Sequence, residues 1–278
     1  GAVADLGARE PLDGAPVETD PRRTLLQGGL AGSVAALLAA CGCGGDDAAA
    51  DASADRDAAL RRDGGKRLRT SFSPVAESTA DGVLVPEGYS AQVLFSAGDA
   101  VESGAAAYAG AFLPSAQTEQ LAGGNHDGMH FYALPGVDPN RGGLLAINHE
   151  FPDFAILMSG AFDANDNSAA GIERKRLALS AVGVSVIEVE SRRNGPWRVK
   201  AGSRYNKRYS GNTLFRVSGP AAAVVGASVV GTLNNCASGM TPWGTYLTCE
   251  ESTSNYLDPT QGALGYGWVV EIDPYGEL

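Results

Sequence analysis

The sequence predicts an all-β protein built as a sandwich or a propeller. Glycine makes up 37 of the 278 residues, which indicates many tight turns. Short runs of alternating or β-branched residues recur between these turns, as is typical of an all-β fold with short strands. The sequence has no clear internal repeat of blade length, so this pattern alone does not choose between a sandwich and a propeller.

Composition restricts the partners that the chain can have. Hydrophobic residues make up 44% of the chain and charged residues 19%, as in an ordinary soluble globular protein. The length suits one large domain or two small ones. The formal net charge of -11 argues against nucleic acid as a dedicated partner, because phosphate backbones bind basic surfaces. An anionic substrate would need bound cations to attract it.

Residues 1–41 have the layout of a twin-arginine export signal with a lipobox-like end. Arg22 and Arg23 precede a weakly apolar, glycine-containing run at 25–40, which is too short and too weak for a comfortable membrane span. Cys41 follows Leu-Ala-Ala, as in a lipobox whose cysteine becomes acylated. We therefore expect the twin-arginine export machinery as a partner and a periplasmic or lipid-anchored product. A plain cleavage site after Ala-x-Ala is the alternative.

Residues 42–70 are expected to form a flexible Ala/Asp/Gly-rich linker. The segment has almost no large apolar residue, so it cannot bury enough surface to offset its chain entropy. The folded domain is expected to occupy the rest of the chain, 71–278.

Within that domain the expected elements are mostly short strands. Segment 102–121 is expected to be a loop insertion, and 175–181 a brief helix or linker. Asparagine, histidine and glutamate end the strand at 143–147, where a rigid sheet can hold polar side chains for ligation or catalysis. Strands are expected at 90–96, 131–134, 143–147, 182–190, 197–200, 224–233 and 246–249, and 267–278 is expected to be a strand that runs into a turn.

The stretch at 234–252 carries the strongest chemical signal. Cys236 lies between asparagines and small residues rather than the apolar neighbours of a core cysteine. A short strand then leads to two adjacent carboxylates. Carboxylates suit hard ions such as calcium and ferric iron, and a thiolate adds a soft ligand that a pure calcium site would not use. The candidate metal ligands are Cys236, Glu150, Glu250, Glu251 and Asp127.

Other sites and pairings are weaker alternatives. The chain has no Gly-x-Ser-x-Gly elbow, Ser-x-x-Lys motif or Walker loop. The segment at 163–168 lacks the glycine and the last acid of an EF-hand. His126 and His130 precede a strand, so a metal-binding helix is not expected, whereas His149 could support Glu150 from behind. A disulfide between Cys236 and Cys249 stays open.

The chain resembles the PhoX-type alkaline phosphatases of bacteria over most of 71–278. Several separate motifs in one order carry this resemblance, which makes it more specific than any single motif. The motifs are Val-Pro-Glu-Gly-Tyr-Ser-Ala-Gln-Val-Leu at 85–94, Leu-Leu-Ala-Ile-Asn-His-Glu at 144–150, Gly-Val-Ser-Val at 183–186, Ser-Arg-Tyr-Asn at 203–206, Ser-Gly-Pro-Ala at 218–221, Gly-Thr-Leu-Asn-Asn-Cys-Ala at 231–237, Thr-Pro-Trp-Gly-Thr at 241–245 and Gly-Trp-Val-Val-Glu-Ile-Asp-Pro at 267–274.

The resemblance implies a β-propeller whose central site holds ferric iron and calcium bridged by an oxo group and cleaves phosphate monoesters. It implies that Cys236 ligates iron, and that Glu150 and the pair Glu250/Glu251 lie in ligand motifs. Asp127 stands where the family shows an Asn-rich motif before an Asp. Because family members are much longer, we expect 71–278 to be the N-terminal part of a propeller, and such an incomplete propeller could lack activity on its own.

The expected reaction is metal-assisted hydrolysis, in which a metal-bound oxygen attacks the phosphate and no protein nucleophile is needed. Two alternatives use the same strands and acids. One is an esterase or lactonase on a calcium-bearing propeller, and the other is a non-catalytic surface-binding propeller.

Overall fold

The computed structural model describes residues 73–192 and 195–276. The chain divides by its internal contacts into residues 1–72 and 73–278, so the described residues belong to the second unit. The predicted export signal at 1–41 and linker at 42–70 lie outside the described residues. Within the described ranges, no helix has the length and apolar character needed to cross a bilayer.

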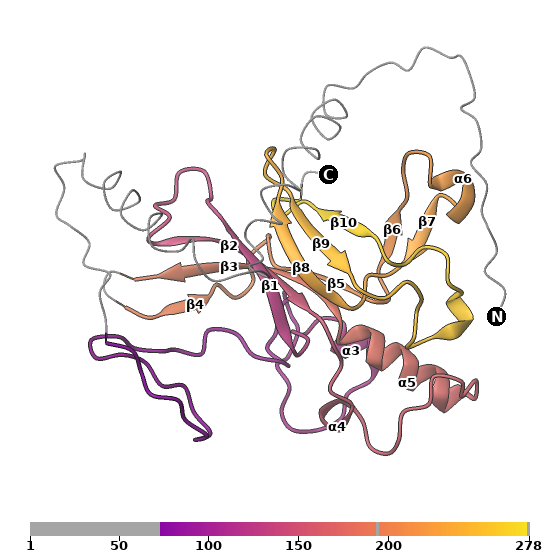
Figure 1. The fold of residues 1–278 in the computed structure, drawn as a ribbon, viewed down its shortest axis with the longest axis horizontal. Helices are drawn as coiled ribbons and strands as arrows, with labels where there is room; N and C mark the ends of the chain where they lie inside the picture. The colour runs from indigo at the N-terminus through magenta and orange to yellow at the C-terminus, as the bar shows by residue number, and fades with distance from the viewer. Residues whose placement is uncertain (1–72, 193–194, 277–278) are drawn as a thin grey trace, which may run out of the picture. The chain divides into compact units, whose positions relative to one another are not determined.

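A five-stranded antiparallel sheet forms one part of the fold (Figure 1). Its strands run in the order β1-β2-β3-β4, and β5 pairs with the first half of β3. The middle strands are buried on both faces, with Leu144, Val184 and Val186 fully enclosed. The strands are β1 (His126–Tyr132), β2 (Gly142–His149), β3 (Gly183–Ser191), β4 (Trp197–Val199) and β5 (Lys207–Ser210).

A three-stranded antiparallel sheet packs against the first sheet. It has the order β10-β9-β8, and β8 lies beside β1 (Figure 1). One hydrophobic cluster joins the two sheets, because Tyr246 and Ile272 of the second sheet contact the buried residues of the first. The strands are β8 (Asn235–Met240), β9 (Tyr246–Glu250) and β10 (Val269–Ile272), and a separate pair is β6 (Leu214–Arg216) with β7 (Ser228–Val230).

The helices are few and short apart from α5 (Ala169–Ser180). The side chain of Ser168 accepts a hydrogen bond from the Gly171 N–H, which caps the start of α5. Leu177 and Leu179 then pack in a second hydrophobic cluster. The remaining helices are α3 (Ser115–Thr118), α4 (Phe154–Leu157), α6 (Ala222–Val225) and the 3-10 turn η1 (Pro259–Gln261).

The strand predictions are confirmed where the strand enters a sheet. Strands β1, β2, β3, β4 and β9 contain or overlap the predicted runs at 131–134, 143–147, 182–190, 197–200 and 246–249. Strand β10 lies within the predicted segment 267–278. The expected strand at 90–96 is wrong, because only Phe95 of this segment is buried and nothing pairs with it as a strand. The run at 224–233 divides into the end of α6 and the short β7.

The helix prediction is too short. Helix α5 begins at residue 169 rather than 175, because the Ser168 cap starts it earlier than the apolar pattern indicates. The described domain is mostly β-sheet with few helices, which is consistent with the all-β prediction.

Candidate metal centre

The first hairpin carries two of the predicted ligands at its end. His126 of β1 pairs with His149 of β2, and the register then shifts by one residue before Met129, which is a β-bulge. Asp127 lies in this bulge, and Glu150 directly follows β2. The backbone N–H of Glu150 donates to the carbonyl of Asn125, a residue in the left-handed region at φ 47°.

The second hairpin repeats this local geometry. Asn235 of β8 pairs with Glu250 of β9, and the register shifts before Ser238. Cys236 therefore occupies the bulge position that Asp127 has in the first hairpin, and Glu251 follows β9 as Glu150 follows β2. The backbone N–H of Glu251 donates to the carbonyl of Asn234, which has φ 54°. The site is thus assembled from two equivalent hairpin ends.

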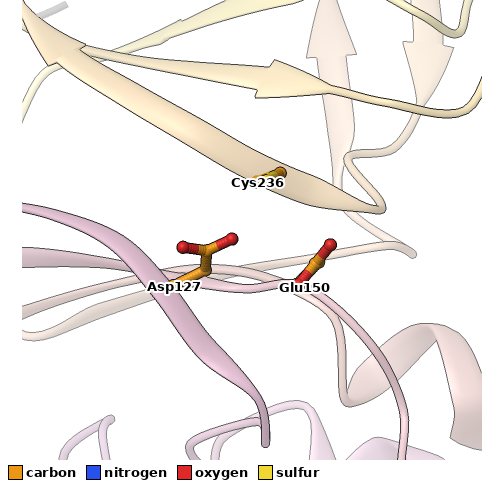
Figure 2. A group of neighbouring side chains, drawn as sticks. All are labelled: Asp127, Glu150 and Cys236. Carbon is orange, nitrogen blue, oxygen red and sulfur yellow. The ribbon is translucent and has the colours of Figure 1, made fainter. Parts of the chain in front are cut away.

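The two hairpins bring three predicted ligands together. Figure 2 shows Asp127 and Glu150 extending toward Cys236 on β8. One candidate ligand atom from each residue lies within 4.8 Å of the other two. Gly128 permits this approach, because a Cβ at this position would lie 2.6 Å from the Ser238 Oγ and 2.7 Å from the Cys236 carbonyl oxygen. Only glycine leaves room for β1 beside β8 here.

The electrostatics of this cluster favour a cation. Hydrogen bonding to Asp127, burial, hydrogen bonding to Glu251 and the nearby negative charges raise the pKa of the Cys236 thiol to about 12. Burial and the charges of Asp127 and Glu251 also raise the pKa of Glu150. In the described part of the chain, none of the salt bridges involves these carboxylates. Like charges held together without a basic partner fit a metal site that mixes hard oxygen donors with one thiolate.

The two adjacent glutamates after the thiol have different surroundings. Glu251 is exposed and close enough to the Cys236 thiol to raise its pKa, so it lies beside the cluster of Asp127, Glu150 and Cys236. Glu250 is buried, and both of its carboxylate oxygens accept hydrogen bonds within the protein. Its Oε1 accepts from the Thr232 hydroxyl at 2.7 Å, and its Oε2 accepts from the Gly267 N–H at 2.9 Å. The structure brings Glu250 to the inner face of the sheet and not to the cluster.

The histidines do not join the cluster. His149 is fully buried, with its Nε2 2.7 Å from the Ser185 hydroxyl, so it does not support Glu150 as expected. His126 packs edge-on against His149 at 4.8 Å between ring centroids. His130 lies on β1 against Tyr132, so the two histidines at 126 and 130 form no helical pair. Cys236 and Cys249 are both free thiols, so the structure contains no disulfide between them.

Tyr256 lies near Glu150, a proximity that the sequence did not indicate. Its ring stacks on Phe151, and its hydroxyl is buried with no hydrogen-bond partner among the described residues. Burial and the charge of Glu150 raise the pKa of Tyr256 to about 12. A tyrosine in a loop after a strand gives no sequence signal of this proximity.

The cluster lies apart from two described cavities. One cavity of about 610 Å³ lies beside α5 and η1 and includes the ion pair between Lys175 and Asp258. The other, of about 300 Å³, is lined by Arg208 and Glu102. Neither cavity is lined by Asp127, Glu150 or Cys236.

Comparison with known proteins gives the chain a family. The sequence model of the family described as alkaline phosphatase PhoX matches residues 70–277. A solved structure, Pseudomonas fluorescens PhoX in complex with vanadate, a transition state analogue, is similar with 35% sequence identity and a TM-score of 0.61. The match covers 73% of this chain and 42% of that chain, so this chain spans less than half the length of that relative. A search of curated proteins gave no match. The chain belongs to the PhoX alkaline phosphatase family.

Proposed function

We propose that this chain supplies part of the metal centre of an exported phosphatase that hydrolyses phosphate monoesters for phosphate scavenging. The observation that carries the proposal is that candidate ligand atoms of Asp127, Glu150 and Cys236 lie within 4.8 Å of one another. Glu251 is close enough to the Cys236 thiol to raise its pKa. The family supports the reaction class, and the vanadate complex of the relative supports a phosphate-like ligand. The activity is proposed for the whole protein.

The proposed metals are ferric iron and calcium. Cys236 is the proposed iron ligand, because a thiolate is a strong donor to iron and a poor one to calcium. Asp127, Glu150 and Glu251 supply oxygen atoms to either metal. Glu250 is left out of the ligand set, since its oxygens already accept hydrogen bonds from the protein.

The residues of the site prepare it for cations. Bound cations would supply electrostatic stabilisation for the charge that develops on the phosphoryl oxygens. The Cys236 thiol must lose its proton to become a ligand, and the raised pKa means that this proton is present in the metal-free chain at neutral pH. The β-bulges and the two asparagines in the left-handed region hold the proposed ligands in position in the metal-free protein.

The test is elemental analysis of the purified protein together with turnover of p-nitrophenyl phosphate with and without calcium. C236S should lose both iron and turnover. C249S is the matched control, because Cys249 is a second free cysteine on the neighbouring strand and should keep both. Vanadate should inhibit turnover. A protein without iron, or a C236S variant with full turnover, would remove the proposal.

Iron content separates this proposal from the two alternatives. A calcium-bearing esterase or lactonase has no need for the Cys236 thiolate, so it would hydrolyse carboxylic esters with no iron bound. A non-catalytic surface module would fold without tightly held iron and would hydrolyse neither class of ester. Both outcomes are read from the same purified protein.

The proposal extends to the parts that the structure does not describe. A twin-arginine signal at 1–41, a linker at 42–70 and the phosphatase domain at 71–278 would give a periplasmic protein or one anchored to the envelope through lipid on Cys41. The described sheets would be part of a β-propeller. N-terminal sequencing and mass measurement of the exported protein test the signal and the anchor.

A further inference from the structure

Asn148 connects the two hairpins that carry the site. It lies on β2, two residues before Glu150, and is fully buried. Its side-chain Nδ2 donates to the carbonyl of Cys236 at 2.8 Å and to that of Ala237 at 3.3 Å. These residues form the bulge of β8, where the strand ladder is disrupted. Asn148 thus holds the backbone that carries the Cys236 thiol.

The orientation of the Asn148 amide is fixed by its partners. Its Oδ1 accepts from the Thr248 hydroxyl at 2.9 Å and lies 2.8 Å from the Tyr246 hydroxyl, whose single proton is shared between this oxygen and the Gly128 carbonyl at 2.9 Å. The opposite side of the amide faces two carbonyl oxygens, which only accept. Reversing the amide would set oxygen against oxygen, so a single orientation remains.

The support extends to Glu250 through a chain of buried groups. The Asn235 amide donates to the Thr248 hydroxyl at 3.0 Å and to the Thr232 hydroxyl at 2.7 Å. Thr232 in turn donates to Glu250. The Thr248 and Thr232 hydroxyls each accept from the Asn235 amide and donate to one acceptor. The hydrogen bonds therefore run from Asn235 through Thr248 to Asn148 and through Thr232 to Glu250.

We infer that Asn148 is a positioning residue that sets the separation between the Cys236 thiol and the carboxylates of the first hairpin. The inference rests on the proposed function, because it concerns the same metal centre. Asn148 is not among the proposed metal ligands. Removing it would free the β8 bulge to move away from Asp127 and Glu150, and residues that orient metal ligands typically contribute 10- to 100-fold to metal affinity.

The test compares N148L with N206L in the full chain. Asn206 is a matched control, since it is a buried asparagine of the same domain that accepts from the Glu188 N–H and donates to the Lys200 carbonyl. The probe is Co²⁺ added to metal-free protein, and the thiolate-to-cobalt absorption reports coordination by cysteine. N148L should bind Co²⁺ roughly 10- to 100-fold more weakly than wild type. N206L should bind it as wild type does.

A second measurement needs no metal. Hydrogen exchange of the β8 amides in the metal-free protein should be faster in N148L and unchanged in N206L, because of these two asparagines only Asn148 donates hydrogen bonds to β8. If N148L does not fold, T248V replaces it, since this variant removes one donor to Asn148 and should weaken Co²⁺ binding on the order of threefold to tenfold.

The outcomes separate the inference from the proposed function. If N148L matches N206L in both Co²⁺ affinity and β8 exchange, or T248V binds as wild type does, Asn148 is not a positioning residue. If wild-type protein gives no thiolate-to-cobalt absorption, the proposed metal centre fails instead. In that case the exchange measurement still decides whether Asn148 holds the β8 bulge.

Discussion

Glu250, the last residue of β9, and Glu251, which follows it, should differ in their response to the same substitution. Glu250 accepts four hydrogen bonds of 2.7 to 3.3 Å from Thr232, Leu233, Gly267 and Trp268. In E250Q one oxygen becomes an NH₂ group, and whichever way the amide turns, at least one backbone N–H loses its acceptor. A buried donor without an acceptor costs about 1–3 kcal/mol. Burial raises the pKa of Glu250, so removal of its charge offsets part of this cost.

Glu251 should show the converse. Its side chain is exposed and lies among like charges, so E251Q should change the free energy of unfolding of the metal-free protein by less than about 0.5 kcal/mol. Its loss as a ligand should weaken Co²⁺ binding by about tenfold or more. E250Q should bind Co²⁺ as wild type does once both are folded.

Urea unfolding and Co²⁺ titration of both variants decide the matter. Unfolding must be measured without metal, because bound metal adds to the stability of the folded state by mass action. An E250Q variant that loses metal affinity at unchanged stability, or an E251Q variant that loses stability at unchanged metal affinity, would contradict these roles. A loss of both properties in both variants would mean that the two glutamates act together.

Three further predictions concern the thiol, the contact between the hairpins and the core. The pKa of Cys236 is raised to about 12, so Co²⁺ must displace the thiol proton when it binds. The affinity for Co²⁺ should therefore rise about tenfold per pH unit at neutral pH and fall as pH falls. A Co²⁺ affinity that does not depend on pH would exclude the thiolate as a ligand. G128A adds a Cβ 2.6 to 2.7 Å from three atoms of β8, so it should lower the free energy of unfolding by about 1–3 kcal/mol and weaken Co²⁺ binding. G239A on β8 adds a Cβ with no atom within 4 Å and should keep its Co²⁺ affinity. Equal Co²⁺ affinities of the two variants would contradict the close contact. Arg208 donates to five backbone carbonyls in the core, so R208M should lower the free energy of urea unfolding by about 3–5 kcal/mol. R198M removes an exposed salt bridge and should lower it by less than about 1 kcal/mol. Similar losses in the two variants would argue against a stabilising role of the Arg208 hydrogen bonds.

Much of the sheet architecture could be predicted from the sequence. The alternation at 182–190 and the apolar run at 143–147 gave β3 and β2, because both strands are buried between neighbours and packing selects apolar residues there. The segment at 90–96 has a similar alternation without a partner strand, and it stays unpaired. Local pattern reports the potential to form a strand, and pairing realises it.

The repeat of the two hairpin ends could not be predicted. The hairpins have in common a left-handed asparagine, a one-residue bulge and a glutamate after the returning strand, while the residue in the bulge is Asp127 in one and Cys236 in the other. The spacing between bulge and glutamate also differs, because the loops between the strands have different lengths. A repeat of backbone geometry with so few common residues leaves almost no trace in the sequence.

The sequence by itself determined the types of candidate ligand and most of the strands, because chemistry and alternation are local properties of the chain. Only the tertiary structure decided which acids meet the thiol. Strand β9 carries Tyr246 and Thr248 on one face and Leu247 and Cys249 on the other, so alternation does not show which face is buried. Packing of β8 and β9 on β1 and β2 buried the face of Glu250, and Glu251 was thereby left exposed beside the Cys236 thiol.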